Sequence, residues 1–385
     1  MATPKRKPSA KSSKKSKTIE KNRIAQWLES NFRTIAFGIL GLAFLFRVWL
    51  LIELPRMPFS RMEKNPDLDM AFFDTWADRI AHGDFLTDTI LHPYHTWHKQ
   101  AAEAMGVSND QEGKERWNKI YGGKTYHQEP FYPQVLGIAK MLGGDGHFLM
   151  YILQMLSTLL SIWMVIWLGR HYFGELAGLS AGLLFTLYSP GLLFDVMLLR
   201  TSFTTCYALG LLVVSEQLIV GKNKPWFFGL LGGIGYLLQT SMMLLWIPLL
   251  VRWLYLQKGD VRRSWQVVLG FFGVLSLLMI RNSIVGAPLM SDSSVGPVTY
   301  VLSNFPAYHP QLGFAVFVEI GKVMEITHGK MLASMLYIIG KHHTAWQWVS
   351  LQFEKLFMVF QWYEVPNNVN SYVPRMFSMP LKLSF

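Results

Sequence analysis

The chain has 385 residues, of which 51% are hydrophobic and 16% are charged, and its formal net charge is +11. Soluble domains usually carry about 25% charged residues, so this composition excludes an ordinary soluble domain and predicts a protein embedded in a membrane. The single cysteine, Cys206, excludes an intramolecular disulfide framework.

Much of the positive charge lies in residues 1–33, which hold ten Lys and Arg against Glu20 and Glu29. The part up to about Thr18 is rich in Ser, Lys and Pro and is expected to be disordered. Such a tail could bind nucleic acid, but a basic flank directly before an apolar helix is more typical of a topology signal. The apolar run lacks a small-residue cleavage site. We therefore expect a cytoplasmic N-terminus, an uncleaved anchor and no nucleic-acid partner.

Several of the apolar stretches that follow are close to the ~20 residues that a spanning helix needs. If the tail is cytoplasmic, alternation of the spans puts three short basic connections on the cytoplasmic side, as the positive-inside rule requires. These connections contain Arg170-His171, Lys222 with Lys224, and Lys258 with Arg262-Arg263. The stretches are about 34–54, 147–169, 175–193, 201–220, 226–240, 242–257 and 264–280.

The sequence thus predicts an all-α integral membrane protein, a polytopic helical bundle of about seven or more spans with a large first extracytoplasmic loop. Apolar patches at 331–339 and 351–360 form no clean span, and the chain stops as if approaching another helix, so we expect its last segment to be incomplete. The predicted parts are a basic tail (1–33), a first transmembrane helix (34–54), an extracytoplasmic catalytic loop (55–146), a multi-span core (147–280) and an extracytoplasmic segment (281–385).

Glycines recur at four-residue spacing in two of the apolar stretches. They are Gly174, Gly178 and Gly182, and then Gly229 and Gly233. This small-xxx-small pattern favours close helix packing in lipid over a ligand role.

Carboxylates gather just after the first span, where an acidic group near lipid is costly unless it has a function. Asp69, Phe73, Trp76 and Ile80 are spaced as one face of a helix that starts at Asp69. Asp67 or Asp69 could simply cap that helix. We favour a general base or an ion ligand, because the segment lies where the first span leaves the membrane. The other acids of this segment are Asp74, Asp78 and Asp84.

Two further groups of polar residues follow in the same loop. Tyr126-His-Gln-Glu-Pro-Phe-Tyr-Pro133 opens an amphipathic stretch at 134–142 and is typical of an interfacial belt, although His127 and Glu129 could face the same cleft as Asp69. Three histidines at three-residue spacing could bind a transition metal, but a polar loop is favoured because no partner ligand has standard spacing. They are His92, His95 and His98.

Three arginines near one leaflet could neutralise the phosphate of a lipid-linked substrate. Arg200 follows Asp195 by five residues, so the two could pair, and Arg281 ends the seventh stretch. Arg47 lies within the first span and must snorkel, pair or line a cavity.

The order of these motifs resembles the polytopic GT-C glycosyltransferases of the bacterial family-39-like group, akin to protein mannosyltransferases and lipid A aminoarabinose transferases. The resemblance covers about residues 34–385. It rests on a span with Arg47, the pattern Asp-x-x-x-aromatic-x-x-Trp-Ala-x-x-Ile-x-x-Gly-Asp from Asp69 to Asp84, Pro130-Phe-Tyr-Pro133, Leu168-Gly-Arg-x-x-Phe-Gly174, Pro190 to Arg200, Arg281-Asn282, and the run Glu364-Val-Pro-Asn-Asn-Val-Asn370.

This resemblance implies transfer of a sugar from a polyprenyl-phosphate-linked donor to a lipid, glycan or protein acceptor outside the cytoplasm, at the bacterial inner (plasma) membrane. It places the catalytic base, or a metal-linked carboxylate, at Asp69, so a divalent metal could take part, although no metal site is assigned. Relatives of the aminoarabinose type have Lys where this chain has Glu129, and many have Arg-Pro where it has Gln239-Thr240.

We therefore predict a membrane glycosyltransferase with Asp69, Asp67 and Glu129 as catalytic candidates. Arg200, Arg281 and Arg47 are the candidates that bind the donor phosphate. The alternative is a non-enzymatic transporter or flippase of a lipid-linked saccharide, which would more typically show inverted repeats and broken helices.

Overall fold

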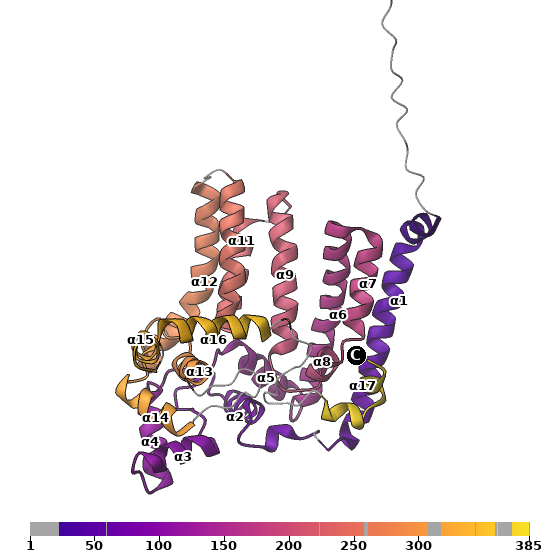
Figure 1. Ribbon diagram of the computed structural model, residues 1–385. Coiled ribbons are helices and arrows are strands. Elements are labelled where there is room, and N and C mark those ends of the chain that lie inside the picture. Colours follow the sequence, from indigo (N-terminus) through magenta and orange to yellow (C-terminus); the bar gives the residue numbers. More distant parts are fainter. Residues whose placement is uncertain are drawn as a thin grey trace, which may run out of the picture.

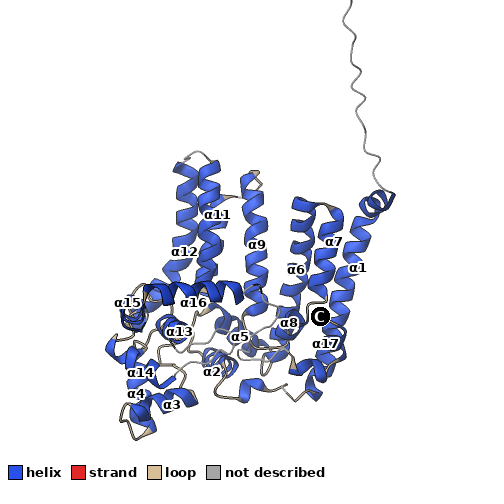
Figure 2. Cartoon of the chain, viewed as in Figure 1, coloured by secondary structure: helices blue, strands red, loops and turns tan. Residues whose placement is uncertain are grey.

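The computed structural model describes residues 23–58, 60–222, 224–257, 261–306, 317–342, 344–358, 360 and 372–384. Every regular element in these ranges is a helix (Figure 2). The predicted Asn-rich run 364–370 and most of the basic tail lie outside the described residues.

The membrane-spanning part consists of long and short apolar helices, which confirms a polytopic helical membrane protein. Within the described residues, four helices are long and apolar enough to cross a membrane, and they are α1 (Arg23–Glu53), α6 (His147–Phe173), α9 (Thr201–Ile219) and α12 (Val261–Val285). Shorter apolar helices beside them are α7 (Glu175–Thr186), α10 (Pro225–Leu238) and α11 (Met243–Leu256), and a fourth short apolar helix spans Met331–Gly340.

The prediction of one continuous span over 175–193 is wrong at its C-terminal end. Helix α7 stops at Thr186, and a separate short helix, α8 (Ser189–Phe194), begins just before Pro190. Proline has no backbone N–H and disfavours helical backbone in the residue before it, so it starts the new helix instead of continuing the old one.

The apolar helices stand side by side, and most of the remaining helices gather at one end of them (Figure 1). Helix α1 begins at the opposite end, where the α6–α7 turn also lies. We call the gathered helices the cap, and they are α2 (Asp69–Ala81), α3 (Thr96–Ala104), α4 (Asp110–Ile120), α5 (Phe131–Leu142), α13 (Val295–Asn304), α14 (Phe317–Ile326), α15 (Met331–His342) and α16 (Ala345–Met358). The short elements are η1 (Leu54–Arg56), η2 (Met62–Lys64), η3 (Thr240–Met242), η4 (Val373–Met376) and α17 (Met379–Leu383).

Helix α2 has the buried face that its sequence predicts. It starts at Asp69, and Phe73, Trp76 and Ile80 are all buried. They pack in one apolar cluster with Leu136 of α5. The charged end of α2 is therefore held in place by an apolar core beneath it.

Glycines bring two pairs of apolar helices into close contact, as predicted for the lipid environment. A Cβ on Gly178 would lie 2.5 Å from the carbonyl oxygen of Ile166, between α7 and α6. A Cβ on Gly229 would lie 2.0 Å from the carbonyl oxygen of Val267, between α10 and α12. Gly174 differs, since its φ of +93° places it in the turn between α6 and α7, and no heavy atom lies within 4 Å of its Cβ position.

The first prediction concerns sidedness. In a background in which Cys206 is replaced by Ala, we expect Ser108→Cys in the cap to react with a membrane-impermeant maleimide on intact cells. Lys222→Cys, at the opposite end of the bundle, should react only after lysis, because basic connections favour the cytoplasm. The reverse pattern would contradict the predicted orientation.

The second prediction concerns the contact between α10 and α12. A Cβ on Gly270 would lie 2.0 Å from the carbonyl oxygen of Trp226, so Gly270→Ala should push the two helices apart and lower the melting temperature of the detergent-purified protein. Gly273→Ala on the same helix is the matched control, since no heavy atom lies within 4 Å of that Cβ position. Equal melting temperatures of the two variants would show that this contact does not hold the helices together.

Candidate active site

The segment from Tyr126 to Pro130, just before α5, connects the cap to the membrane-spanning helices. His127, Gln128 and Glu129 are all buried. The carbonyl oxygens of Tyr126 and His127 accept hydrogen bonds from the backbone N–H groups of Ser294 and Val295 at the start of α13. A buried backbone needs such partners, and they fix the direction in which the three side chains leave the segment.

Glu129 binds the start of α9 and the turn between α10 and α11. Its Oε2 pairs with the guanidinium of Arg200. Its Oε1 accepts the backbone N–H of Thr240 at 2.9 Å and lies 3.0 Å from the Thr240 hydroxyl. Burial opposes ionisation, but the charge of Arg200 and the Thr240 N–H outweigh it and lower the pKa of Glu129 below its usual value. Glu129 is therefore a carboxylate held in an ion pair.

A second carboxylate approaches the same hydroxyl. Oδ2 of Asp292 lies 2.5 Å from Oγ1 of Thr240, which is also the neighbour of Glu129. A threonine hydroxyl has one proton, so it donates to only one of the two carboxylates at a time.

Asp69 lies beside this ion pair through the residue next to Glu129. The Nε2 of Gln128 donates a hydrogen bond of 2.9 Å to Oδ1 of Asp69. Consecutive residues thus hold Asp69 on one side and Arg200 on the other. The structure brings together these predicted site residues, Asp69, Glu129 and Arg200, in one region.

Asp67 has a different position. Its Oδ1 accepts the backbone N–H of Thr96 at 2.7 Å, and its Oδ2 accepts the Thr96 hydroxyl at 2.8 Å. These two bonds lower the pKa of Asp67, and they bind the first residue of α3. The alternative that Asp67 or Asp69 caps α2 is wrong, because the N-cap residue of α2 is Leu68, and Asp67 instead bonds the first residue of α3.

Arg47 and Arg281 are deeply buried, at 1% and 5% exposure, whereas the side chain of Arg200 is 21% exposed. The Nε of Arg47 lies 2.7 Å from Oδ2 of Asp195. The expectation that Asp195 pairs with Arg200 is therefore wrong. Arg281 donates to the carbonyl oxygens of Leu86 and Thr87 at 2.7 Å, and its guanidinium lies 3.8 Å from the centre of the Tyr126 ring.

Asp74, another acid of the first loop, belongs to a network that ties α2 to the helices beside it. Its Oδ1 lies 2.7 Å from Nζ of Lys140 on α5 and 2.6 Å from Nε2 of His147 on α6. Asp78 accepts from the same Lys140 at 2.6 Å. Although burial opposes ionisation, the bonds to His147 and Lys140 lower the pKa of Asp74.

The three histidines with metal-like spacing are part of the aromatic interior of the cap. His92 lies between Asn118 and the carbonyl oxygen of Thr125, and the Nε2 of His98 is 2.7 Å from the Tyr121 hydroxyl. Burial lowers the pKa of His98 to about 2, so this ring is neutral. Among the described residues, no group of three or more His, Cys, Asp or Glu side chains is arranged to hold a metal ion.

The sequence did not single out Gln128, Thr240 or Asp292 as parts of this region. Gln239-Thr240 stood out only as a departure from the Arg-Pro of similar proteins, at the end of a short apolar stretch. Helix α10 ends at Leu238 and α11 begins at Met243. Gln239-Thr240 therefore starts the turn between the two helices, and the backbone N–H of Thr240 bonds Glu129 of the ion pair.

A comparison with known families finds a match over part of the chain. The family model for dolichyl-phosphate-mannose-protein mannosyltransferase matches residues 127–283. This supports a membrane glycosyltransferase. No curated protein and no solved structure matches the chain. The matched segment contains Glu129, Arg200 and Thr240, whereas Asp69 precedes it.

The third prediction tests the buried ion pair. Because the pKa of Glu129 lies below its ordinary value of 4.5, ionised Glu129 stabilises the fold above pH 4.5, and this stabilisation is lost as the pH falls through the folded-state pKa. We expect Glu129→Gln to melt at a lower temperature than the wild type at pH 7, since Arg200 loses its partner. The difference should shrink below pH 4.5.

Tryptophan fluorescence of the detergent-purified protein at several pH values measures this difference. Glu112→Gln is the control, because Glu112 is exposed on α4, and it should melt like the wild type throughout. A Glu129→Gln deficit that stays constant between pH 7 and the acid range would contradict the linkage.

Proposed function

We propose that the protein transfers a glycosyl group from a polyprenyl-phosphate donor to a hydroxyl or amine acceptor on the cap side of the membrane. The observation that carries this proposal is the chain of contacts from Asp69 through Gln128 and Glu129 to Arg200. It sets a carboxylate suited to accept a proton near a guanidinium suited to bind a phosphate. The family match over 127–283 supports the reaction class.

Arg200 is the arginine best suited to the donor phosphate. It is the most exposed of the three candidates, and its Nη1 alone is used in the ion pair with Glu129. Its other donors make no hydrogen bond with the described residues, whereas Arg47 and Arg281 are fixed on Asp195 and on backbone carbonyls. Glu129 then acts as a positioning residue that holds Arg200 in one orientation.

The proposed reaction is a single displacement. The acceptor oxygen or nitrogen forms a bond to the anomeric carbon of the donor while the bond from that carbon to the phosphate oxygen breaks. The electron pair of the broken bond stays on the phosphate, where Arg200 stabilises the charge, so no acid is needed for departure. The proton of the acceptor passes to Asp69. One displacement of this kind inverts the anomeric centre.

The alternative of a transporter or flippase gains no support from the α10–α11 region. The short helices around Gln239 form a hairpin that turns at η3, where Thr240 contacts Glu129. They do not form one spanning helix broken near mid-membrane, which is the arrangement typical of transporter substrate sites.

The fourth prediction is that Asp69→Asn lowers transfer by about 10²- to 10⁴-fold, because it keeps the shape of the side chain but removes the proton acceptor. Asp67→Asn is the matched control two residues away. It should retain most activity, since Asp67 binds Thr96. Transfer is measured in membranes with a panel of labelled polyprenyl-phosphate sugars, and folding by gel filtration in detergent.

Two results would count against this proposal. Near-normal turnover by a well-folded Asp69→Asn protein would remove Asp69 from the mechanism. Absence of transfer by the wild type with every donor in the panel would contradict the proposed reaction itself.

A further inference from the structure

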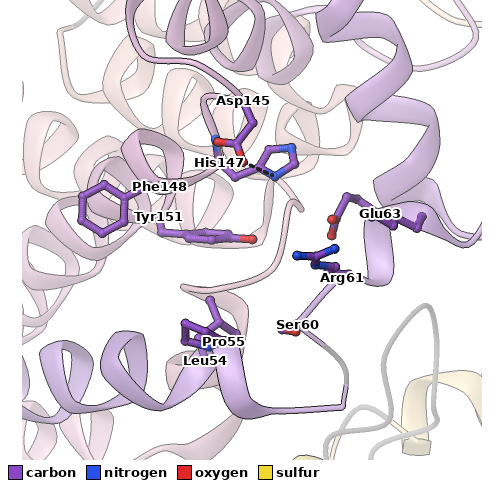
Figure 3. A pocket seen from close by; sticks show the side chains of 10 residues that line it. Leu54, Pro55, Ser60, Arg61, Glu63, Asp145, His147, Phe148 and Tyr151 are labelled. Carbon is purple, nitrogen blue, oxygen red and sulfur yellow. Dashed lines mark hydrogen bonds and ion pairs between the residues drawn. The ribbon is translucent and has the colours of Figure 1, made fainter.

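A polar cavity lies where the first span ends and α6 begins, and none of Asp69, Glu129 and Arg200 lines it. Its volume is about 530 Å³, within the range of small-molecule sites. Leu54 and Pro55 of η1 form one side, and Phe148 and Tyr151 from the first turns of α6 form another (Figure 3). The loop around η2 closes the third side with Ser60, Arg61, Glu63 and Lys64.

This cavity contains charged side chains of both signs, and the fold leaves Arg61, Glu63 and Lys64 without an ionic partner among the described residues. The side chains of Arg61, Glu63 and Lys64 make no hydrogen bond or ion pair with any residue that the structure describes. Asp145 accepts the backbone N–H of His147 at 3.1 Å, and its Oδ2 is 3.7 Å from that imidazole. Figure 3 shows Arg61 and Glu63 facing the cavity opposite Asp145 and His147.

The cavity lies at the level where lipid headgroups are found, because it joins the cap-side ends of two membrane-spanning helices. Large apolar side chains are exposed directly beside it, since Ile52 on the last turn of α1 is 66% exposed and Phe148 is 67% exposed. A lipid with its headgroup in the cavity would lay its acyl chains against these side chains.

We propose that this cavity binds the phosphoethanolamine headgroup of a phospholipid in the leaflet on the cap side. The phosphate lies against Arg61 and Lys64, and the ammonium group lies against Glu63 and Asp145. A purely anionic headgroup would leave both carboxylates opposed by like charge. A choline headgroup has no N–H with which to bond them.

Headgroup binding in this cavity does not depend on the proposed transfer reaction. It does connect the lipid to the Asp69 helix, because His147 of the cavity contacts Asp74 of α2 at 2.6 Å. A ligand that binds only the folded form stabilises it, so occupancy should raise the melting temperature of the whole chain.

Native mass spectrometry of the full chain in detergent tests this, with phosphatidylethanolamine, phosphatidylglycerol and phosphatidylcholine of identical acyl chains. We expect the wild type to retain phosphatidylethanolamine preferentially. Arg61→Gln combined with Lys64→Gln should reduce its retention by about tenfold. Glu63→Gln combined with Asp145→Asn should abolish the preference over phosphatidylglycerol. Lys119→Gln, an exposed lysine of α4 in the cap, is the matched control and should behave like the wild type.

Competition with soluble phosphoethanolamine tests whether the headgroup alone binds the cavity or whether the whole lipid is needed. We expect millimolar phosphoethanolamine to displace the lipid, whereas ethanolamine alone should not. Equal affinity for the soluble compound and the lipid would overturn the membrane part of the proposal. Equal retention of the three lipids by the wild type, or unchanged preference in both double variants that remain monodisperse in gel filtration, would overturn the site.

Discussion

The buried ion pair between Glu129 and Arg200 joins the cap to the membrane-spanning helices. A buried carboxylate is tolerated only with its charge paired and its oxygens bonded, and Glu129 meets both needs through Arg200 and Thr240. Once Glu129 is fixed, its neighbours are fixed too, because they share one short backbone segment. Gln128 then donates its hydrogen bond to Asp69, and the Tyr126 ring packs against the guanidinium of Arg281. The segment that this ion pair fixes therefore contacts both α2 and α12.

Within the membrane the helices are joined by other means, since lipid provides no hydrophobic force between them. Glycines allow close backbone contact between α6 and α7 and between α10 and α12. A polar network joins α1, α6 and α9 around Asp195, which accepts from Arg47 of α1, Thr158 of α6 and Ser202 of α9. The carboxylate of Asp195 is thus paired and bonded, as a buried charge near lipid requires, while Nη2 of Arg47 is buried without a hydrogen-bond partner among the described residues.

The sequence predicted the helices better than their partners. Apolar runs located α6, α9 and α12 within about five residues, whereas α1 begins at Arg23, well before the predicted start at residue 34. The spacing of Phe73, Trp76 and Ile80 predicted the buried face of α2. These features depend on local periodicity, which one chain displays directly. The ion pairs do not depend on local periodicity, so the sequence does not display them. Arg200 follows Asp195 by five residues but begins a new helix, and its partner is 71 positions away. Such pairings arise from tertiary packing, of which the sequence shows only that charged residues near lipid need partners.

The carboxylates of the first loop differ in what their oxygens already do, and this bears on which of them suits a general base. Both oxygens of Asp67 hold Thr96, and those of Glu129 hold Arg200 and Thr240. Bonds of this kind lower the pKa of a carboxyl group, which makes it a weaker proton acceptor. Glu129 is therefore suited to orienting Arg200, and the proposed proton acceptor is Asp69 at the start of α2, four residues before Phe73 on the apolar face.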